Sequence, residues 1–382
     1  MNEQIRLAVN HFENLLRQQL ERVSRLEETS QPIDYATLSP LVIGVIGGDG
    51  IGPLLVKQTR RLLDFLLQDE LDEGSVLIRN IDGLTLARRQ KLGQAVPQDT
   101  LEAIKDCHVL LKGPTETPKG GSLESANVTL RRELDLYANV RPVSLPQEGI
   151  DWTFFRENTE GEYVLGSSGL EIDGKLAMDF KVTTDAGTRR IARAALEFAR
   201  KNGKTKLAIV TKANIMKKTD GKFSRLVHEE AAAYPEIEAD DWYIDIMTAN
   251  LLNPAIRDSF QVFVLPNLYG DILTDEAAQL QGGVGTAGSA NLGDRYAMFE
   301  AIHGSAPRMI EEGLADYCNP SSLFRAAWMM LVHLGKQGAA DRLGRALEIC
   351  LESEKRLVVT GDRQGARCDQ FTDYVLETLQ QL

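Results

Sequence analysis

Residues 262–276 read VFVLPNLYGDILTDE, a strand pattern that passes directly into a helix pattern. Four consecutive apolar residues, two of them valines, are typical of a buried strand, and Pro266 and Gly270 mark the turn that ends it. Asp271 and Asp275 follow at the start of the expected helix, so both carboxylates point to one face. The pair is either a helix start that favours acids against the helix dipole or a site for a hard cation such as Mg²⁺ or Mn²⁺. Spacing alone leaves both interpretations open.

The bulk composition bounds the class of protein. The chain has 382 residues, 43% of them hydrophobic, and a formal net charge of -12. An acidic chain argues against nucleic acid as the main partner, because phosphate binding needs a basic face. The four cysteines fit neither a zinc spacing nor a disulfide framework, which favours a reducing compartment, and we expect the cytoplasm. We expect no membrane partner, since no apolar run approaches the ~18 residues of a span.

Strand and helix patterns alternate along the chain, which predicts an α/β protein with a largely parallel sheet. The glycine-rich turn GGDGIGP (47–53) lies between the first strand and the first helix of this alternation. It lacks the G-x-G-x-x-G dinucleotide fingerprint, because Pro53 stands where the last glycine would be. Ahead of it, residues 3–28 place apolar side chains at three- and four-residue steps. This spacing predicts an amphipathic helix that could pack on its own subunit or on a neighbour.

Several polar residues stand at the ends of expected strands and helices. Arg131, Arg141 and Arg156 could converge on a substrate with several carboxylates, or each could be an ordinary salt-bridged arginine. Tyr163 offers a phenol that could act as an acid if its neighbours perturb it. Lys212 lies just beyond a buried strand, where its pKa could be lowered as a general base requires, or it is an ordinary surface lysine.

A family likeness rests on six motifs in order: GGDGIGP (47–53), SANVTLRRELDLYANVRP (125–142), FRENTEGEY (155–163), TKANIMKKTDG (211–221), PNLYGDILTDEAA (266–278) and FEAIHGSAP (299–307). Over about residues 41–380 the chain resembles the β-decarboxylating dehydrogenases of the isocitrate/isopropylmalate dehydrogenase family. The resemblance implies an open α/β sheet fold that is not a Rossmann fold, with a large domain, a small dimer-forming domain, and active sites shared by two subunits.

The resemblance also implies a division of the chain. We expect a helical extension at 1–40, which is not part of the common family pattern. A large cofactor-side domain would comprise 41–135 and 282–382, and a small domain at 136–281 would carry the dimer contacts and the metal ligands. Because the active sites are shared, the resemblance implies a homodimer or a higher homo-oligomer.

Residue roles follow from the same resemblance. Tyr163 and the neighbouring subunit's copy of Lys212 would handle protons. The ligands of Mg²⁺ or Mn²⁺ would be Asp271 and Asp275 from one subunit and Asp245 from the other. The implied substrate-binding residues are Ser125, Asn127, Arg131, Arg141, Arg156 and Asn214, and the implied cofactor-binding residues are His303, Gly304, Arg308, Asn319 and Asp362.

The start of the helix holding Arg131 distinguishes substrates within the family. Isocitrate enzymes show a serine and an asparagine there, as Ser125 and Asn127 do here. A hydroxyl and an amide can hydrogen-bond a third carboxylate, whereas burial against an isopropyl group would leave them unpaired. We therefore expect isocitrate, a tricarboxylate, with homoisocitrate, isopropylmalate or another 3-substituted malate as the alternative.

Cofactor choice depends on residues after HGSAP. NADP-type members carry a Lys-Tyr pair there, and NAD-type members an aspartate, whereas this chain has Arg308-Met309. The segment TGDRQG (360–365) lacks the tyrosine of NADP-type members and is as short as in NAD-type members, which favours NAD over NADP. Arg308 or Arg363 could still attract a phosphate.

Two other function classes stay open. Some family members are non-catalytic regulatory subunits of a heteromeric enzyme, but these usually lose the catalytic tyrosine, lysine or metal acids, which this chain retains as Tyr163, Lys212, Asp271 and Asp275. The chain could also be a binding protein that holds a tricarboxylate without turnover. The sequence favours the catalytic, metal-dependent dehydrogenase.

Overall fold

In a computed structural model, the chain folds into two compact units. The structure describes residues 2–26, 32–118, 123–166, 168–283 and 287–382. Unit 1 comprises Met1–Gln31, Tyr137–Val140 and Ser144–Glu276. Unit 2 comprises Pro32–Leu136, Arg141–Val143 and Ala277–Leu382. Strand β4 (Ala138–Leu145) therefore contributes residues to both units.

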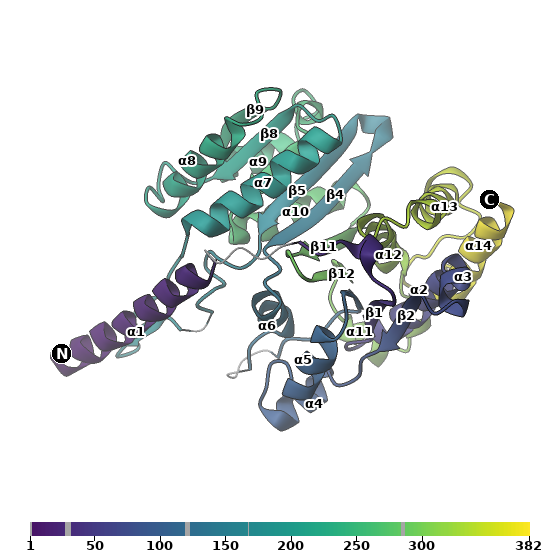
Figure 1. Cartoon of the computed structure of the whole chain (residues 1–382), viewed down its shortest axis with the longest axis horizontal. Helices are drawn as coiled ribbons and strands as arrows, with labels where there is room; N and C mark the ends of the chain where they lie inside the picture. Colours follow the sequence, from purple (N-terminus) through teal and green to yellow (C-terminus); the bar gives the residue numbers. More distant parts are fainter. Residues whose placement is uncertain (1, 27–31, 119–122, 167, 284–286) are drawn as a thin grey trace. The chain divides into compact units, whose positions relative to one another are not determined.

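Unit 1 is built on four parallel strands. Their order is β5 (Ile150–Glu157), β10 (Val262–Leu265), β8 (Lys206–Thr211) and β9 (Glu238–Tyr243). All four residues of β10 are fully buried, as a continuous apolar run predicts for a parallel strand that is covered on both faces. Helices α7 (Asp185–Lys201) and α8 (Thr219–Ala231) lie over the face of these strands that is turned to the viewer in Figure 1.

Aromatic side chains fill the core of unit 1. The rings of Phe154 on β5 and Phe263 on β10 stack at a centroid distance of 4.3 Å, and Trp152 packs edge-on against both. Burial of each such ring contributes roughly 1.5–3 kcal/mol to the free energy of unfolding. This packing keeps the carboxyl ends of β5 and β10 in a fixed register.

The remaining elements of unit 1 lie around this sheet. Helix α1 (Asn2–Leu26) confirms the amphipathic helix expected from residues 3–28. Strands β6 (Leu170–Ile172) and β7 (Leu176–Met178) pair only with each other as a short antiparallel hairpin. Helix α9 (Ile244–Leu251) follows β9, the short 3₁₀ turns are Pro146–Glu148 and Arg257–Ser259, and α10 (Asn267–Leu280) follows β10 and ends beyond the unit boundary.

Unit 2 is built on five strands in the order β2 (Val76–Asn80), β1 (Leu41–Ile46), β3 (Val109–Lys112), β12 (Ala297–Ala301) and β11 (Gly288–Leu292). The first four are parallel, and β11 pairs antiparallel with β12. Its core includes Ile46, Leu110, Leu130 and Met298. The predicted α/β fold with a largely parallel sheet is confirmed.

The helices of unit 2 have the following bounds: α2 (Gly52–Leu66), α3 (Gln68–Asp72), α4 (Leu86–Leu92), α5 (Gln98–Lys105), α6 (Ala126–Glu133), α11 (Pro307–Glu311), α12 (Ser321–His333), α13 (Gln337–Glu348) and α14 (Cys368–Gln381). Short 3₁₀ turns cover Tyr35–Thr37 and Ala315–Tyr317, and a π-helical turn covers Ile349–Ser353. All four cysteines are buried and none forms a disulfide. No helix in the described part of the chain is long and apolar enough to cross a membrane.

The glycine-rich turn at 47–53 serves the packing of unit 2. Gly48 and Gly50 have positive φ values of 73° and 59°. A Cβ atom on Gly48 would lie 2.1 Å from the carbonyl oxygen of Pro114, and one on Gly50 would lie 1.9 Å from that of Ser305. Only glycine fits both positions, because the left-handed backbone and the close approach exclude a side chain. These glycines are thus explained by contact with the protein's own backbone.

Candidate active site

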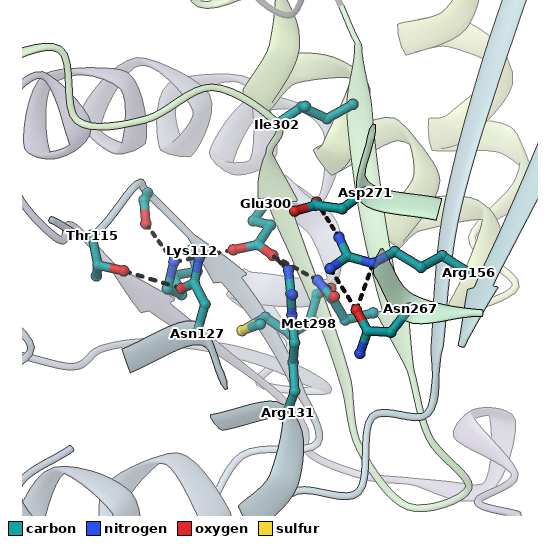
Figure 2. A network of polar contacts seen from close by, with 12 residues as sticks. Lys112, Thr115, Asn127, Arg131, Arg156, Asn267, Asp271, Met298, Glu300 and Ile302 are labelled. Atoms are coloured by element: carbon teal, nitrogen blue, oxygen red, sulfur yellow. Dashed lines mark hydrogen bonds and ion pairs between the residues drawn. The ribbon is translucent and has the colours of Figure 1, made fainter. Parts of the chain in front are cut away.

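Asp271 is the centre of a polar cluster in unit 1. The strand register pairs Leu265 of β10 with Arg156 of β5, so Arg156 lies beside the start of α10. The Arg156 guanidinium donates through NH1 to Oδ1 of Asp271, and through Nε and NH2 to Oδ1 of Asn267 at 3.0 and 2.7 Å (Figure 2). Tyr163 donates its hydroxyl to Oδ2 of Asp271 at 2.9 Å. Three residues predicted from the sequence, Arg156, Tyr163 and Asp271, are therefore in contact.

Gly270 makes room for the Arg156 side chain. A Cβ atom on Gly270 would lie 2.5 Å from Cγ and 2.7 Å from Cβ of Arg156, closer than real Cβ contacts. The Arg156 side chain is only 1% exposed, whereas that of Asp271 is 39% exposed. The buried arginine thus holds a carboxylate that faces outward, which is the arrangement a ligand-binding acid needs.

The α10 acids fit a hard divalent cation. Asp275 lies one helical turn after Asp271 and is exposed. Arg156 and Tyr163 bind one oxygen each of Asp271, and a carboxylate offers about four lone-pair positions. Carboxylate oxygens are the ligands that Mg²⁺ prefers, usually one or two with waters and substrate oxygens. Among the described residues, no group of three or more His, Cys, Asp or Glu side chains is placed to hold a metal.

Lys212 and Asp245 form a second contact in unit 1. The register pairs Thr211 of β8 with Tyr243 of β9, so the residues that follow these strand ends meet. Nζ of Lys212 lies 2.6 Å from Oδ1 of Asp245, whose side chain is 66% exposed. This hydrogen bond lowers the pKa of Asp245 and keeps it an anion. Asn214 lies exposed in the turn after β8.

A buried aspartate fixes the backbone at Lys212. The amide nitrogen of Lys212 donates to Oδ2 of Asp220 at 2.8 Å, and Asp220 is fully buried. Lys181 lies 2.6 Å from Asp220 and balances its charge. The resemblance assigns Lys212 and Asp245 to the same subunit, and the structure brings these two side chains together within one chain.

Ser125, Asn127 and Arg131 lie in the first turns of α6 in unit 2. Ser125 occupies the N-cap position, but its hydroxyl makes no capping hydrogen bond. Oδ1 of Asn127 accepts a hydrogen bond from the Thr115 hydroxyl at 3.0 Å, which turns the donor side of the amide away from Thr115 (Figure 2). Arg131 is 9% exposed and donates to Oε1 of Glu300 at 3.3 Å.

Glu300 joins a buried ion cluster that sequence reasoning missed. Its Oε2 lies 3.1 Å from Nζ of Lys112, and its Oε1 also accepts from Asn291 at 2.8 Å (Figure 2). Burial opposes ionisation, but the charges of Lys112 and Arg131 outweigh it and hold the pKa of Glu300 at about 2. Lys112 and Glu300 are direct cross-strand partners in the β3–β12 register. The only sequence signal was the position of Glu300 within the FEAIHGSAP motif.

Arg89 is a second residue that sequence reasoning did not select, and it supports the segment that leads to Ser125. It is fully buried, and its guanidinium donates to the carbonyl oxygens of Ala95 at 2.7 Å, Glu116 at 2.8 Å and Glu124 at 3.1 Å. An arginine is normally expected to be exposed, so the sequence alone offers no reason to select Arg89. Arg141 lies buried on β4.

The residues expected near the cofactor lie in three loops of unit 2 and in the short helix α11 that follows one of them. His303 Nδ1 hydrogen-bonds the carbonyl oxygen of the exposed Gly304 at 3.0 Å, and burial lowers the His303 pKa. Arg308 is the second residue of the short helix α11 and pairs with Glu312, just after the helix, at 2.5 Å. Oδ1 of Asn319 accepts the amide of Ser321 at the start of α12, 3.0 Å away.

Asp362 lies in the third of these loops. Its Oδ1 accepts the Thr360 hydroxyl at 2.6 Å and the Gln364 amide at 2.9 Å. These hydrogen bonds lower the pKa of Asp362, so the side chain is an anion at neutral pH. The loop thus presents a fixed, exposed negative charge.

Comparison with known proteins shows the family. The model of the isocitrate/isopropylmalate dehydrogenase family matches residues 42–375. A probable mitochondrial NAD isocitrate dehydrogenase subunit alpha of Drosophila melanogaster is 37% identical over 350 residues, which cover 88% of this chain and 87% of that protein. The chain belongs to the isocitrate/isopropylmalate dehydrogenase family, whose members are decarboxylating dehydrogenases.

Relatives of similar identity carry different names. A 3-isopropylmalate dehydrogenase of Methanothermobacter thermautotrophicus is 37% identical over 81% of this chain and 91% of its own length. An NADP isocitrate dehydrogenase of Rickettsia prowazekii is 37% identical over 83% of this chain, which spans 64% of that protein. A homoisocitrate dehydrogenase of Methanocaldococcus jannaschii is also 37% identical, over 84% of this chain and 92% of its own length.

A solved structure agrees with the family assignment. The crystal structure of isocitrate dehydrogenase from Methylococcus capsulatus has a TM-score of 0.78 and 35% identity, and it covers 88% of this chain and 99% of that one. The predicted α/β open-sheet fold of this family is thereby confirmed. Because relatives of equal identity carry different substrate names, identity alone does not distinguish their substrates.

Proposed function

We propose that this protein oxidises and decarboxylates isocitrate to 2-oxoglutarate and CO₂, with a divalent metal and with hydride transfer to NAD. The observation that supports isocitrate is the polar start of α6. The Ser125 hydroxyl makes no capping hydrogen bond. The NH₂ group of Asn127 points away from Thr115, because Oδ1 of Asn127 accepts the Thr115 hydroxyl. A hydroxyl and an amide can bind a third carboxylate, whereas an isopropyl group would leave both without partners.

We assign the binding of the substrate carboxylates to three buried arginines. Arg131, Arg141 and Arg156 are 9%, 6% and 1% exposed. A planar guanidinium binds a carboxylate in bidentate geometry and stays charged when buried, which suits a substrate with three carboxylates. Glu300 and Asp271 compensate Arg131 and Arg156, so these guanidiniums are held in place before substrate binds.

We assign the proton-transfer steps to Tyr163 and Lys212. Asp271 orients the Tyr163 hydroxyl at 2.9 Å, and Asp245 orients the Lys212 ammonium at 2.6 Å. When bound to Asp271 and Asp275, a divalent ion would stabilise the negative charge that develops on the substrate oxygens. Tyr163 can then protonate the carbon that loses CO₂, because a positioned phenol is an effective general acid.

The choice of NAD is supported by two charged side chains. Asp362 carries a fixed negative charge, which suits ribose hydroxyls and repels a 2′-phosphate. The Arg308 guanidinium is already paired with Glu312 at the end of α11, which reduces its attraction for a phosphate. NADP remains the alternative cofactor.

A shared active site in a homodimer completes the proposal. Asp271 and Asp275 would provide two carboxylate ligands of the metal ion. The third ligand would be Asp245 of the partner subunit. The cytoplasm is the proposed compartment, which fractionation of the source cells would test.

The experiment is a matrix of NAD and NADP against isocitrate, homoisocitrate and isopropylmalate, with Mn²⁺ present. We expect the highest kcat/KM with isocitrate and NAD. Highest turnover of isopropylmalate would contradict the interpretation of Ser125 and Asn127. A protein that forms no reduced cofactor, yet stimulates a partner enzyme, would be a regulatory subunit instead.

A further inference from the structure

Helix α1 lies outside the family match, which begins at residue 42, yet it makes specific polar contacts within unit 1. One of these contacts is made by Arg22. NH1 of Arg22 lies 3.2 Å from Oε1 of Glu160, and NH2 donates to the carbonyl oxygen of Thr159 at 3.3 Å. The side chains of Arg22 and Glu160 are 14% and 4% exposed. The contact is therefore far better shielded than a surface ion pair.

Glu160 is buried close to a second buried acid, Glu157. Glu157 is 2% exposed, and its carboxylate accepts the amide nitrogens of Thr159 at 2.9 Å and Glu160 at 2.6 Å. Glu160 in turn accepts the amide of Thr184 at 2.9 Å. Two neighbouring buried carboxylates repel each other, so a cation beside Glu160 favours this arrangement of the loop. Arg22 supplies such a cation from the extension.

A second contact of α1 lies beyond Tyr163. Nε2 of His11 lies 2.9 Å from the carbonyl oxygen of Ser168, and the ring of Phe12 lies 5.3 Å from that of Phe180. Helix α1 thus touches the chain on both sides of Tyr163, four residues before it at Thr159 and five residues after it at Ser168.

We propose that Arg22 is a positioning residue, which acts through Thr159 and Glu160 to hold the loop that places the Tyr163 hydroxyl against Asp271. This inference rests on the proposed function, in which Tyr163 transfers a proton. The Tyr163 hydroxyl must stay within hydrogen-bond distance of its partners, and a displacement of about 1 Å can cost up to a hundredfold in rate. The extension would therefore contribute to turnover through its effect on the position of Tyr163.

The test compares Arg22→Ala, Arg22→Gln and Arg22→Lys with Arg17→Ala in the full chain. Arg17 lies on the same helix, is 69% exposed and pairs only with the exposed Glu13 among the contacts described. We expect Arg22→Ala to lower kcat roughly tenfold with a smaller change in KM, because the reacting group is displaced while the arginines remain. Arg22→Lys should restore most of kcat, and Arg17→Ala should match the wild type.

Hydrogen exchange of the amides at 158–166 supplies a readout that needs no turnover. We expect exchange there to be faster in Arg22→Ala and normal in Arg17→Ala, with thermal unfolding used to confirm that each variant is folded. Arg22→Gln keeps a donor for the Thr159 carbonyl but removes the charge, and it serves if Arg22→Ala does not fold. Unchanged exchange at 158–166, or faster exchange with an unchanged kcat, would overturn the inference. If the wild type turned over none of the substrates, the proposed function would fail, and exchange alone would still decide whether Arg22 holds the loop.

Discussion

Tyr163 is the residue whose hydroxyl has the clearest chemical assignment, because its partner Asp271 is fixed by the buried Arg156. We expect Tyr163→Phe to lower kcat by roughly 10²–10⁴, the usual contribution of a general acid, with little change in KM. Steady-state kinetics with isocitrate, NAD and Mn²⁺ measure this effect. Tyr296→Phe is the control, since the Tyr296 hydroxyl makes a long 3.4 Å contact with the Lys105 carbonyl. An unchanged kcat in Tyr163→Phe would remove the tyrosine from the mechanism.

Glu157 should make stability depend on pH. Burial and the charge of Glu160 raise its pKa from 4.5 to about 7, although Arg190 and the Thr159 hydrogen bonds oppose the rise. The folded state therefore binds more protons than the unfolded state between these values, so stability falls as pH rises from about 4.5 to about 7. The pKa shift corresponds to a change of roughly 3 kcal/mol in unfolding free energy across this range, at about 1.36 kcal/mol per pKa unit.

The variant Glu157→Gln should flatten this dependence. Urea unfolding at several pH values between 5 and 8 measures the slope for variant and wild type. We expect the unfolding free energy of the wild type, minus that of the variant, to fall as pH rises across this range. At low pH the variant should be less stable than the wild type. The NH₂ group of its glutamine side chain would face the backbone N–H of Glu160, and two donors cannot hydrogen-bond each other. Parallel pH curves would show that Glu157 does not titrate there.

At the scale of elements, the parallel pair β3–β12 is joined by the ion pair of Lys112 and Glu300 as well as by backbone hydrogen bonds. We expect Glu300→Gln to cost about 3–5 kcal/mol, because it leaves a buried ammonium without its counter-charge. Urea unfolding at pH 7 measures the loss. Glu312→Gln, which breaks the exposed pair with Arg308, should cost less than about 1 kcal/mol. Equal losses in the two variants would contradict the assignment.

The helices and strands follow from local sequence patterns, whereas contacts between them do not. The apolar run at 262–265 predicts a buried strand, and β10 is buried at all four positions. The periodicity of residues 3–28 predicts a helix, and α1 spans Asn2–Leu26. That Arg22 on this helix would reach Glu160, 138 residues away, depends on where unit 1 places the helix. No local pattern contains that information.

At the scale of the whole molecule, a shared active site predicts complementation. Lys212→Ala and Tyr163→Phe subunits would each be inactive alone, but a mixed dimer would contain one site with both residues intact. Random mixing should restore about a quarter of wild-type activity, because half of the dimers are mixed and each has one intact site of two. The measurement is activity after the two variants are unfolded together and refolded, with separately refolded variants as the control. No recovery, despite dimers of normal mass, would place Lys212 and Tyr163 in the same subunit's site.

The sequence by itself determined the α/β class, the parallel strands, the family, and residues such as Arg156, Tyr163 and Asp271 that prove to be in contact. It did so because burial and periodicity leave local patterns, and because the motifs keep their residue types in order. Only the tertiary structure decided that Gly270 makes room for Arg156, that Glu300 joins Lys112 to Arg131, and that Arg22 meets Glu160. These contacts join residues that are up to 188 positions apart. The free energy of an ion pair depends on distance and burial, which are set by packing and not by sequence spacing.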